Sequence, residues 1–320
     1  MTLERIVVLG GTGFVGRSVC ERLVERNGGG GGRVLVPTRR PSHASPIRHL
    51  PTVEIVPADV HDDATLARLV AGSDAVINLV AILHGPPAAF EQVHVALPRR
   101  LGAACARAGV RRVVHVSALG VGPGSPSNYL RTKTAGEEAL RAAGLDLTVL
   151  RPSVIFGAED SFLNLFARLQ RLAPVLPLGG SDVRFQPVWV EDVASAVTRS
   201  LDDPRTIGQT YECVGPREYT LAQLVQLAGR WSGHARPQIP LPAPLTRLQA
   251  LALEWLPGPT LMSRDNVDSM KVPNVATGSL PDLTALGIVP AALEAVGPGY
   301  LGAESGRARL GRWRRVARRG

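Results

Sequence analysis

Cysteine is scarce in this chain, and the three residues that occur form no pattern. The number of cysteines is odd and no two of them form a C-x-x-C pair; they are Cys20, Cys105 and Cys213. This argues against a disulfide framework and for a reducing compartment. Each lies in a stretch expected to be helix or strand, where a free cysteine behaves as a small buried apolar residue. No cluster of His, Cys or carboxylate residues has metal-ligand spacing, so we expect no metal site.

Long hydrophobic runs and aromatic side chains are also lacking. No apolar stretch reaches the roughly 20 residues that a membrane helix needs. The N-terminus carries no charged segment ahead of an apolar run, so we expect no signal peptide and a cytoplasmic location. Aromatic residues make up 4% of the 320 residues, whereas hydrophobic residues make up 45%. We therefore expect a sizeable aliphatic core, in one large domain or in one large and one small.

Acidic residues are absent from the C-terminal end, which holds most of the net charge of +9. The arginines of this end are Arg307, Arg309, Arg312, Arg314, Arg315, Arg318 and Arg319. Without them the rest of the chain is nearly neutral, which excludes a whole-domain nucleic-acid surface.

A glycine-rich turn near the N-terminus is the most informative motif that is present. Ile6–Leu9 predicts a buried strand, and Gly10, Gly13 and Gly16 follow at the spacing G-x-x-G-x-x-G. Apolar residues at helical spacing continue through residues 17–26. Strand, glycine turn and helix open a dinucleotide-binding unit, because a pyrophosphate must approach backbone N–H groups at a helix N-terminus. This context makes the fingerprint more specific than the glycines alone.

Strands and helices alternate along the remainder of the chain. Further strands are predicted at 33–37, 53–57, 74–78, 112–116, 147–150 and 211–214, with helices at 64–70 and 90–108 among them. Nearly continuous Val, Ile and Leu in the strands is typical of a parallel sheet covered on both faces. We predict an α/β, Rossmann-type doubly wound fold. Its expected parts are a dinucleotide-binding domain at 1–215, a smaller C-terminal lobe at 216–304 and a basic tail at 305–320.

The ends of the second to fourth strands suggest how the cofactor is selected. An acid at the end of the second strand grips a ribose 2′-hydroxyl, whereas arginine accommodates a 2′-phosphate. Arg39 and Arg40 stand there, which favours NADP(H) over NAD(H); the alternative is two solvated surface arginines. Asp59, followed by Val60, either faces the adenine or caps a turn. Leu79–Ala81 would pass beside the cofactor.

Tyr129 and Lys133 form a Y-x-x-x-K pair on a predicted helix, where residues four apart share one face. Ser117 stands at the end of the preceding strand, at the sheet edge where ligands bind. Hydride transfer at a carbonyl needs a matched proton transfer, and an ammonium near a phenol favours the phenolate and lowers its pKa. We expect Tyr129 to exchange the proton, Lys133 also to hold the nicotinamide ribose, and Ser117 to bind the substrate oxygen. The alternative is an exposed pair on an ordinary helix. His115 we expect to be a packed core residue.

Several stretches in this order carry a resemblance to a known family. They are Gly10–Gly16, Tyr129–Lys133 with Ala135–Glu137, Leu150–Gly157, Phe185–Ala194, Tyr211–Pro216 and Leu261–Asp265. The chain resembles the atypical short-chain dehydrogenases/reductases, and among them the epimerase/dehydratase-like bacterial relatives of the nucleotide-binding accessory subunit of respiratory complex I. The resemblance covers residues 1 to about 275. It implies a nicotinamide cofactor, commonly the phosphorylated form, and links to quinone metabolism or complex I assembly.

The resemblance also assigns places to individual residues. The glycines take the pyrophosphate, Arg39 the 2′-phosphate, Asp59 and Val60 the adenine, and Tyr129 and Lys133 the active-site positions. The remaining residues expected at the cofactor are Thr12, Phe14, Val15, Pro152, Ser153, Val154 and Ile155. The glycine run at 28–32 and the arginine-rich end do not belong to the family pattern.

Three functions agree with these features. The first is an NADP(H)-dependent oxidoreductase acting on a small or lipophilic, quinone-like carbonyl or alcohol. The second is a non-catalytic, cofactor-bound scaffold or assembly factor at a respiratory membrane complex, and the third is a redox-sensing regulator. In the segment 307–320, Leu310, Trp313 and Val316 recur among the arginines, which predicts peripheral membrane contact. The alternative there is a disordered, solvated tail.

Overall fold

The computed structural model describes residues 3–255 and 262–302, which divide into two compact units. The sheet unit comprises residues 3–152, 190–213 and 276–289, and the second unit comprises residues 153–189, 214–255, 262–275 and 290–302. Each unit is therefore assembled from separate stretches of the chain. The predicted basic tail at 305–320 lies outside the described residues.

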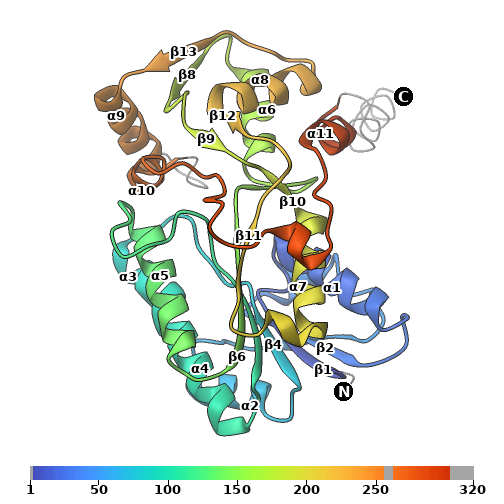
Figure 1. Cartoon of the computed structure of the whole chain (residues 1–320). Coiled ribbons are helices and arrows are strands. Elements are labelled where there is room, and N and C mark those ends of the chain that lie inside the picture. The colour runs from blue at the N-terminus through green and yellow to red at the C-terminus, as the bar shows by residue number, and fades with distance from the viewer. Residues whose placement is uncertain (1–2, 256–261, 303–320) are drawn as a thin grey trace. The chain divides into compact units, whose positions relative to one another are not determined.

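A seven-stranded sheet, parallel throughout, forms the centre of the sheet unit (Figure 1). Its order is β11-β6-β5-β4-β1-β2-β3. The strands are β1 (Arg5–Leu9), β2 (Arg33–Thr38), β3 (Val53–Pro57), β4 (Ala75–Asn78), β5 (Arg112–Val116), β6 (Asp146–Pro152) and β11 (Thr210–Cys213). The order reverses between β1 and β4, and in such sheets ligands bind at the carboxyl ends of the strands beside that point.

Two groups of helices cover the sheet, and Figure 1 shows them on opposite sides of it. One group is α1 (Phe14–Arg26) with α7 (Val190–Asp202); the other is α2 (Asp63–Val70), α4 (Leu97–Ala108) and α5 (Asn128–Arg141). The short helices η1 (Pro41–Ala44), η3 (Pro204–Thr206) and η4 (Leu283–Leu286) also belong to this unit. The structure confirms the predicted Rossmann-type α/β fold.

Helix starts in this unit differ in how they are capped. The Asp62 carboxylate accepts the Thr65 N–H at 2.8 Å and begins α2, and the Ser127 hydroxyl accepts the Leu130 N–H at 3.1 Å and begins α5. Helix α1 instead starts after Gly13, which offers no side chain. The first backbone N–H groups of α1 are therefore left for another acceptor.

The long helix expected at 90–108 is not uniform. It consists of α3 (Pro87–Glu91), a π-helical segment η2 (Gln92–Ala96) and α4. Wider turns of this kind occur mostly as short insertions in α-helices, frequently at functional sites. Residue periodicity alone does not reveal such an insertion.

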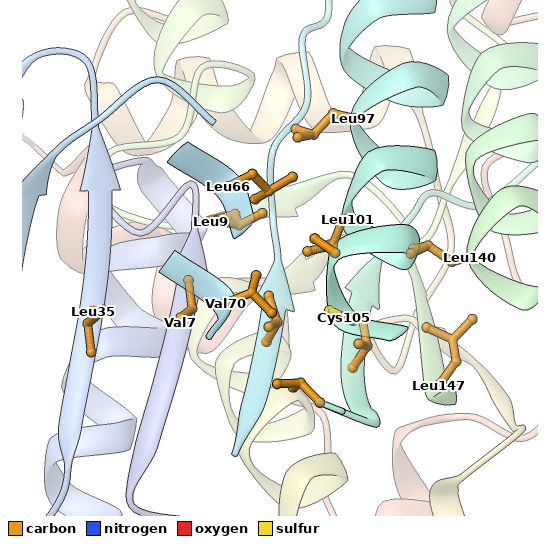
Figure 2. Packing of buried hydrophobic residues seen from close by; sticks show 14 of the residues in the cluster. Val7, Leu9, Leu35, Leu66, Val70, Leu97, Leu101, Cys105, Leu140 and Leu147 are labelled. Carbon is orange, nitrogen blue, oxygen red and sulfur yellow. The ribbon is translucent and has the colours of Figure 1, made fainter. Parts of the chain in front are cut away.

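The core of the sheet unit is aliphatic, as the composition predicts. Figure 2 shows Leu9, Leu66, Leu97 and Leu101 among the side chains that fill it. All three cysteines are buried and free, in agreement with the sequence analysis. Burial raises the pKa of the Cys105 thiol to about 12, so this residue packs as an apolar side chain.

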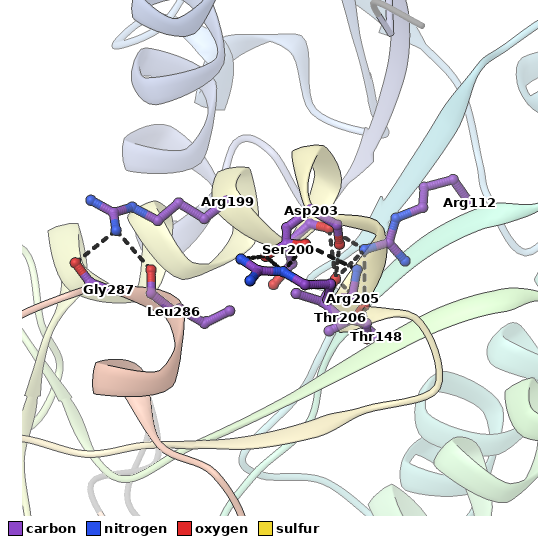
Figure 3. A network of polar contacts seen from close by, with 9 residues as sticks. All are labelled: Arg112, Thr148, Arg199, Ser200, Asp203, Arg205, Thr206, Leu286 and Gly287. Carbon is purple, nitrogen blue, oxygen red and sulfur yellow. Dashed lines mark hydrogen bonds and ion pairs between the residues drawn. The ribbon is translucent and has the colours of Figure 1, made fainter.

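A polar network surrounds Arg112, the first residue of β5, and Figure 3 shows the part of it formed with Thr148, Ser200 and Thr206. The guanidinium donates to the Asp146 carbonyl at 2.6 Å, to the Thr148 hydroxyl at 2.9 Å and to the Thr206 hydroxyl at 3.0 Å. It also donates to the Ser200 carbonyl. These bonds join β5, β6, α7 and η3, so the network stabilises the amino end of the sheet.

The second unit holds smaller sheets and the remaining helices. Its strands are β7 (Ile155–Phe156), β8 (Leu176–Gly179), β9 (Arg184–Phe185), β10 (Val188–Trp189), β12 (Tyr219–Thr220) and β13 (Gln238–Leu241). Its helices are α6 (Leu163–Leu172), α8 (Leu221–Ser232), α9 (Ala243–Glu254), α10 (Arg264–Ser269) and α11 (Leu293–Leu301). The strands pair as β10-β7, β12-β9 and β13-β8. Aromatic side chains gather here, around Phe156 and Leu224, in contrast to the aliphatic core of the sheet unit.

Candidate active site

The glycine turn between β1 and α1 is folded tightly on itself. Gly10 has a φ of +84°, a conformation that L side chains rarely adopt, and Gly13 donates its N–H to the Gly10 carbonyl at 3.0 Å. A Cβ atom at Gly16 would collide with the backbone of Gly10 and Gly11. The turn therefore requires glycine for its own packing, besides leaving room for a ligand.

The start of α1 fits the pyrophosphate of a dinucleotide. The N–H groups of Phe14, Val15 and Gly16 precede the first bond of the helix, which runs from the Arg17 N–H to the Gly13 carbonyl at 3.0 Å. No acidic residue lies in the first turn and no side chain caps it. Helix N-termini of this kind attract anions through their N–H groups and dipole. Thr12, Phe14 and Val15 thus lie where the sequence predicts cofactor residues.

The segment after β4 lies directly against the glycine turn. The Leu79 N–H donates to the Leu9 carbonyl at 2.9 Å, and a Cβ atom at Gly10 would come within 3.1 Å of the Leu79 backbone. This contact is the point at which the strand order reverses. Leu79, Val80 and Ala81 therefore follow the edge of the predicted cofactor site.

The ends of β2 and β3 are joined by the Ala58 N–H, which donates to the Thr38 carbonyl at 3.1 Å. This bond places the residues that follow β2 and β3, Arg39 and Asp59, near each other. Arg39 and Arg40 are both exposed. Asp59 Oδ1 accepts the His61 N–H at 3.0 Å, so Asp59 does cap a turn. Its contact with an adenine, and that of Val60, stay predictions.

The carboxyl end of β5 buries polar groups whose partners are few. His115 is 2% exposed, and its Nδ1 lies 3.2 Å from Asn78 Nδ2, which agrees with the expected core position. Because the Asn78 amide nitrogen is a donor, His115 Nδ1 accepts and Nε2 carries the proton. Among the described residues, neither His115 Nε2 nor Ser117 Oγ has a hydrogen-bond partner. Ser117 Oγ thus retains its capacity to bind a ligand oxygen.

Lys133 is buried on α5, and only 2% of it is exposed. Its Nζ donates to the Val116 carbonyl at 2.7 Å. The Glu137 carboxylate, one turn away, is held by Arg151 at 3.0 and 2.7 Å. Burial lowers the pKa of Lys133 to about 8, and Glu137 opposes this shift. An ammonium has three donors, so the contacts within residues 3–255 and 262–302 leave two for a ligand. Ribose hydroxyls suit such donors, and the lysine therefore fits the predicted cofactor.

Tyr129 lies one helical turn before Lys133 and packs edge-to-face on His94, with ring centroids 5.4 Å apart. The sequence argument expects the ammonium to lower the pKa of the phenol. That expectation is wrong for this structure, because burial raises the pKa of Tyr129 to about 12. The phenol is therefore protonated near neutral pH, in the state of a proton donor.

The stretch from Pro152 to Ile155 crosses from one unit to the other. Pro152 ends β6 in the sheet unit, and its carbonyl accepts the Leu119 N–H at 2.9 Å. In the second unit, Ser153 Oγ lies 2.6 Å from Asn274 Oδ1, which also accepts the Val154 N–H at 2.9 Å. The contact of these four residues with a nicotinamide stays a prediction. Their bonds to Asn274 could not be foreseen from positions so distant in sequence.

His94 is a residue that the sequence analysis overlooked. It lies in η2 and is 2% exposed. Its Nε2 accepts the Ile82 N–H at 3.1 Å, and its Nδ1 lies 3.0 Å from Thr132 Oγ1. An isolated histidine in a helical stretch gave no sign of these contacts. The described residues contain no group of three or more His, Cys, Asp or Glu that could hold a metal ion. No helix of the described residues combines the length and the hydrophobicity needed to cross a membrane.

The fold and these residues define a dinucleotide-binding α/β protein, and comparison with known proteins agrees. The model of the NAD dependent epimerase/dehydratase family matches residues 6–214. Subunit 9 of the NADH dehydrogenase [ubiquinone] 1 alpha subcomplex, from the mitochondria of Mus musculus, is 33% identical over 301 residues, or 90% of this chain and 77% of that protein. A ceramide reductase of Caulobacter vibrioides is 33% identical over 201 residues, or 62% of this chain and 61% of that protein.

Solved structures share the fold at lower identity. A nucleoside-diphosphate-sugar epimerase from Staphylococcus aureus matches with a TM-score of 0.69 and 18% identity, over 91% of this chain and 98% of that one. A dTDP-glucose 4,6-dehydratase from Streptomyces venezuelae matches with a TM-score of 0.64 and 24% identity, over 74% and 84%. The chain belongs to the NAD dependent epimerase/dehydratase family. This membership confirms the expected class, an NAD(P)-binding protein of the oxidoreductase type.

Proposed function

We propose that this protein is an NADP(H)-dependent oxidoreductase that interconverts a small or lipophilic carbonyl compound and its alcohol. The observation that carries the proposal is the buried Lys133 ammonium, which has donors to spare beside Tyr129 at the carboxyl end of the sheet. A cation is costly to bury without partners, so its retention there favours a role toward a ligand.

The chain's own residues would divide the work as follows. The nicotinamide cofactor, when bound, supplies or accepts the hydride. Tyr129, protonated near neutral pH, donates the matching proton to the carbonyl oxygen, and Ser117 Oγ donates a hydrogen bond to the same oxygen. Lys133 would hold the ribose with its remaining donors. Its pKa is about 8, so it loses its proton more readily than an ordinary lysine. The carbonyl is thereby polarised by two donors while the hydride arrives.

Preference for the phosphorylated cofactor rests on Arg39 and Arg40. Both guanidinium groups are exposed at the end of β2, and no acid stands at the end of that strand. A ribose 2′-phosphate would find charge-assisted donors there, whereas a 2′-hydroxyl would find no carboxylate.

The substrate class draws support from the relatives. Ubiquinone and ceramide appear in the names of two of them, and both are lipophilic molecules with carbonyl or alcohol groups. We infer that the substrate here is quinone-like or lipid-like. The experiment is a screen for NADPH oxidation with short-chain quinones and lipophilic aldehydes and ketones, run on the native chain and on Tyr129→Phe.

Removal of the phenolic oxygen should leave the fold intact and lower kcat by about 10²–10⁴-fold. Tyr211→Phe is the matched control, since Tyr211 is a buried tyrosine on β11 and should not affect turnover. Native turnover by Tyr129→Phe with an identified substrate would contradict the proposed role of Tyr129.

A second candidate function is a cofactor-bound scaffold at a respiratory membrane complex. Identity of 33% to a complex subunit across 90% of this chain favours it. The arginine-rich segment 307–320, outside the described residues, would supply a peripheral membrane contact, since each arginine near an anionic leaflet contributes about 1 kcal/mol. Sedimentation with anionic and neutral liposomes, for the full chain and a chain ending at Gly306, tests that contact. Binding of the full chain alone, reversed by high salt, is the expected result; equal behaviour of both chains would overturn it.

A further inference from the structure

His94 joins two parts of the sheet unit that the proposed chemistry needs together. Its Nε2 accepts the Ile82 N–H at 3.1 Å, in the loop that follows β4 and Leu79–Ala81. Its Nδ1 bonds Thr132 on α5 at 3.0 Å, and its ring lies edge-on to the Tyr129 ring at an interplanar angle of 81°. The loop along the predicted cofactor and the helix that bears the phenol therefore meet at one side chain.

The hydrogen bonds fix the protonation of this imidazole. A backbone N–H can only donate, so Nε2 accepts and carries no proton. Nδ1 then carries the proton and donates it to Thr132 Oγ1. The Thr132 hydroxyl in turn donates a hydrogen bond to the Asn128 carbonyl at 2.7 Å. Both ring nitrogens of His94 and the Thr132 hydroxyl thus have partners in this series of hydrogen bonds, which runs from the Ile82 N–H to the Asn128 carbonyl. A second proton on His94 would face the Ile82 N–H.

Electrostatics keep the imidazole neutral as well. Burial, helped by the charge of Lys133, lowers the pKa of His94 to about 3. His115, on β5, is lowered in pKa mainly by burial and then by Lys133 and His94. Two neutral histidines therefore accompany Lys133, which is left as the cation of this cluster. A neutral, fully bonded ring is suited to hold neighbours in place rather than to exchange protons.

The backbone of His94 also lies close to α5. It lies in the π-helical segment η2, and a Cβ atom on Gly136 of α5 would collide with the His94 carbonyl. Glycine at this position therefore lets α5 approach η2 closely. The side chain and the carbonyl of one residue hold the same helix at two levels, near Thr132 and near Gly136.

We propose that His94 is a positioning residue, which fixes the loop after β4 and the Tyr129 phenol in the mutual arrangement required for hydride and proton transfer. This inference rests on the proposed function of Tyr129. His94 itself exchanges no proton with the substrate, and it acts through Ile82 and α5. Small misplacements of reacting groups cost up to about a hundredfold in rate, which sets the scale of its effect.

The test compares His94→Phe, Thr132→Val and their double mutant with Thr134→Val. Phenylalanine keeps a flat ring against Tyr129 but removes both hydrogen bonds, and Thr132→Val removes one of them. Thr134 is the matched control, because its hydroxyl bonds only the Leu130 carbonyl of its own helix, at 2.9 Å. Thr132→Val also keeps the test decisive if His94→Phe does not fold.

Two measurements on the folded chain need no substrate. The first is the exchange rate of the Ile82 amide hydrogen, which should rise at least about tenfold in His94→Phe. The second is the NMR signal of the phenolic carbon of Tyr129, assigned with Tyr129→Phe among only four tyrosines. That signal should shift or broaden in His94→Phe and Thr132→Val and remain native in Thr134→Val. The double mutant should resemble His94→Phe, since both changes remove one shared bond.

A kinetic measurement then separates positioning from general stability. With an active substrate, His94→Phe should lower kcat by about ten- to a hundredfold and alter KM for NADPH far less. An unchanged Ile82 exchange rate and Tyr129 signal in His94→Phe would overturn the inference, as would equal effects of Thr132→Val and Thr134→Val. If instead Tyr129→Phe turned over normally, the proposed function would fail, while the exchange and NMR results would still decide the structural role of His94.

Discussion

Two buried cations lie at the two ends of strand β5: Arg112 is its first residue, and Lys133 of α5 contacts its last, Val116. The two differ in how many hydrogen-bond partners the fold gives them. Arg112, at the amino end, donates to two backbone carbonyls and two hydroxyls of neighbouring segments, and Figure 3 draws the partners on Thr148, Ser200 and Thr206. Lys133, at the carboxyl end, donates to the Val116 carbonyl and retains two donors within the described part of the chain. Burial lowers the pKa of both groups. Arg112 thus has several partners in the fold, and only its Nε lacks one among the described residues. Lys133 has a single hydrogen-bond partner among them, and we propose that a bound cofactor uses its remaining donors.

From this difference we propose separate roles for the two ends of the sheet. A buried charge is tolerated when hydrogen bonds compensate it, so Arg112 can contribute to stability. An incompletely compensated charge costs stability, and such costs are characteristic of functional sites. Ser117 follows the same rule as Lys133, since its hydroxyl is buried and without a partner among the described residues.

The largest effect on stability should come from the amino end. Arg112→Met removes the donor of several hydrogen bonds in this network, each worth about 1–3 kcal/mol, so we expect a loss of about 3–5 kcal/mol in the free energy of unfolding. Urea denaturation measures it. Arg111→Met is the matched control, because Arg111 is an exposed neighbour paired with Asp146 and should cost less than about 1 kcal/mol. Equal losses from the two variants would remove the distinction between the buried and the surface arginine.

A smaller effect is expected at the carboxyl end of β2. Arg39→Ala should weaken NADPH binding about tenfold or more, since a charge-assisted bond contributes about 1.5–3 kcal/mol, and should leave NADH binding nearly unchanged. Calorimetry with both cofactors measures it. Arg68→Ala, an exposed arginine on α2, serves as the control. Tighter binding of NADH than of NADPH by the native chain would refute the cofactor preference.

The smallest effect is a dependence of stability on pH. Lys133 has a pKa of about 8 in the folded chain and about 10.4 when unfolded, so between these values the unfolded chain binds more protons. Stability contributed by this group therefore rises with pH through that window. Relative to Lys133→Met, the native chain should gain roughly 1–2 kcal/mol in unfolding free energy from about pH 8 to about pH 9.5. A flat difference between the two variants would mean that Lys133 keeps its ordinary pKa.

Much of this organisation could be predicted from the sequence, because it depends on local patterns. A strand and a turn are predicted by the apolar run Ile6–Leu9 and the glycines after it. The spacing of Tyr129 and Lys133 predicts that both lie on one face of a helix. What could not be predicted depends on tertiary contacts. The burial that raises the pKa of Tyr129, and the bonds from His94 to Ile82 and Thr132, arise between segments far apart in the chain.

Local patterns also do not predict which segments of the chain belong to which unit. A simple boundary after residue 215 follows from composition, but residues 153–189 group with the second unit and residues 276–289 with the sheet unit. Arg199 holds that last segment, donating to the Leu286 and Gly287 carbonyls at 2.7 Å (Figure 3). No spacing of residue types signals a bond between positions so far apart.

The most direct test of the contrast between the two cations is to measure NADPH affinity and unfolding free energy together in Lys133→Met. Lys271→Met is the matched control, because Lys271 is the other lysine of the chain and pairs with Asp268 at 2.6 Å. We predict that Lys133→Met binds NADPH at least about tenfold more weakly. Its unfolding free energy near neutral pH should stay within about 1 kcal/mol of the native value or rise, since an incompletely bonded charge has been removed. Native NADPH affinity together with a stability loss as large as that of Arg112→Met would show that Lys133 serves the fold, and would contradict the account.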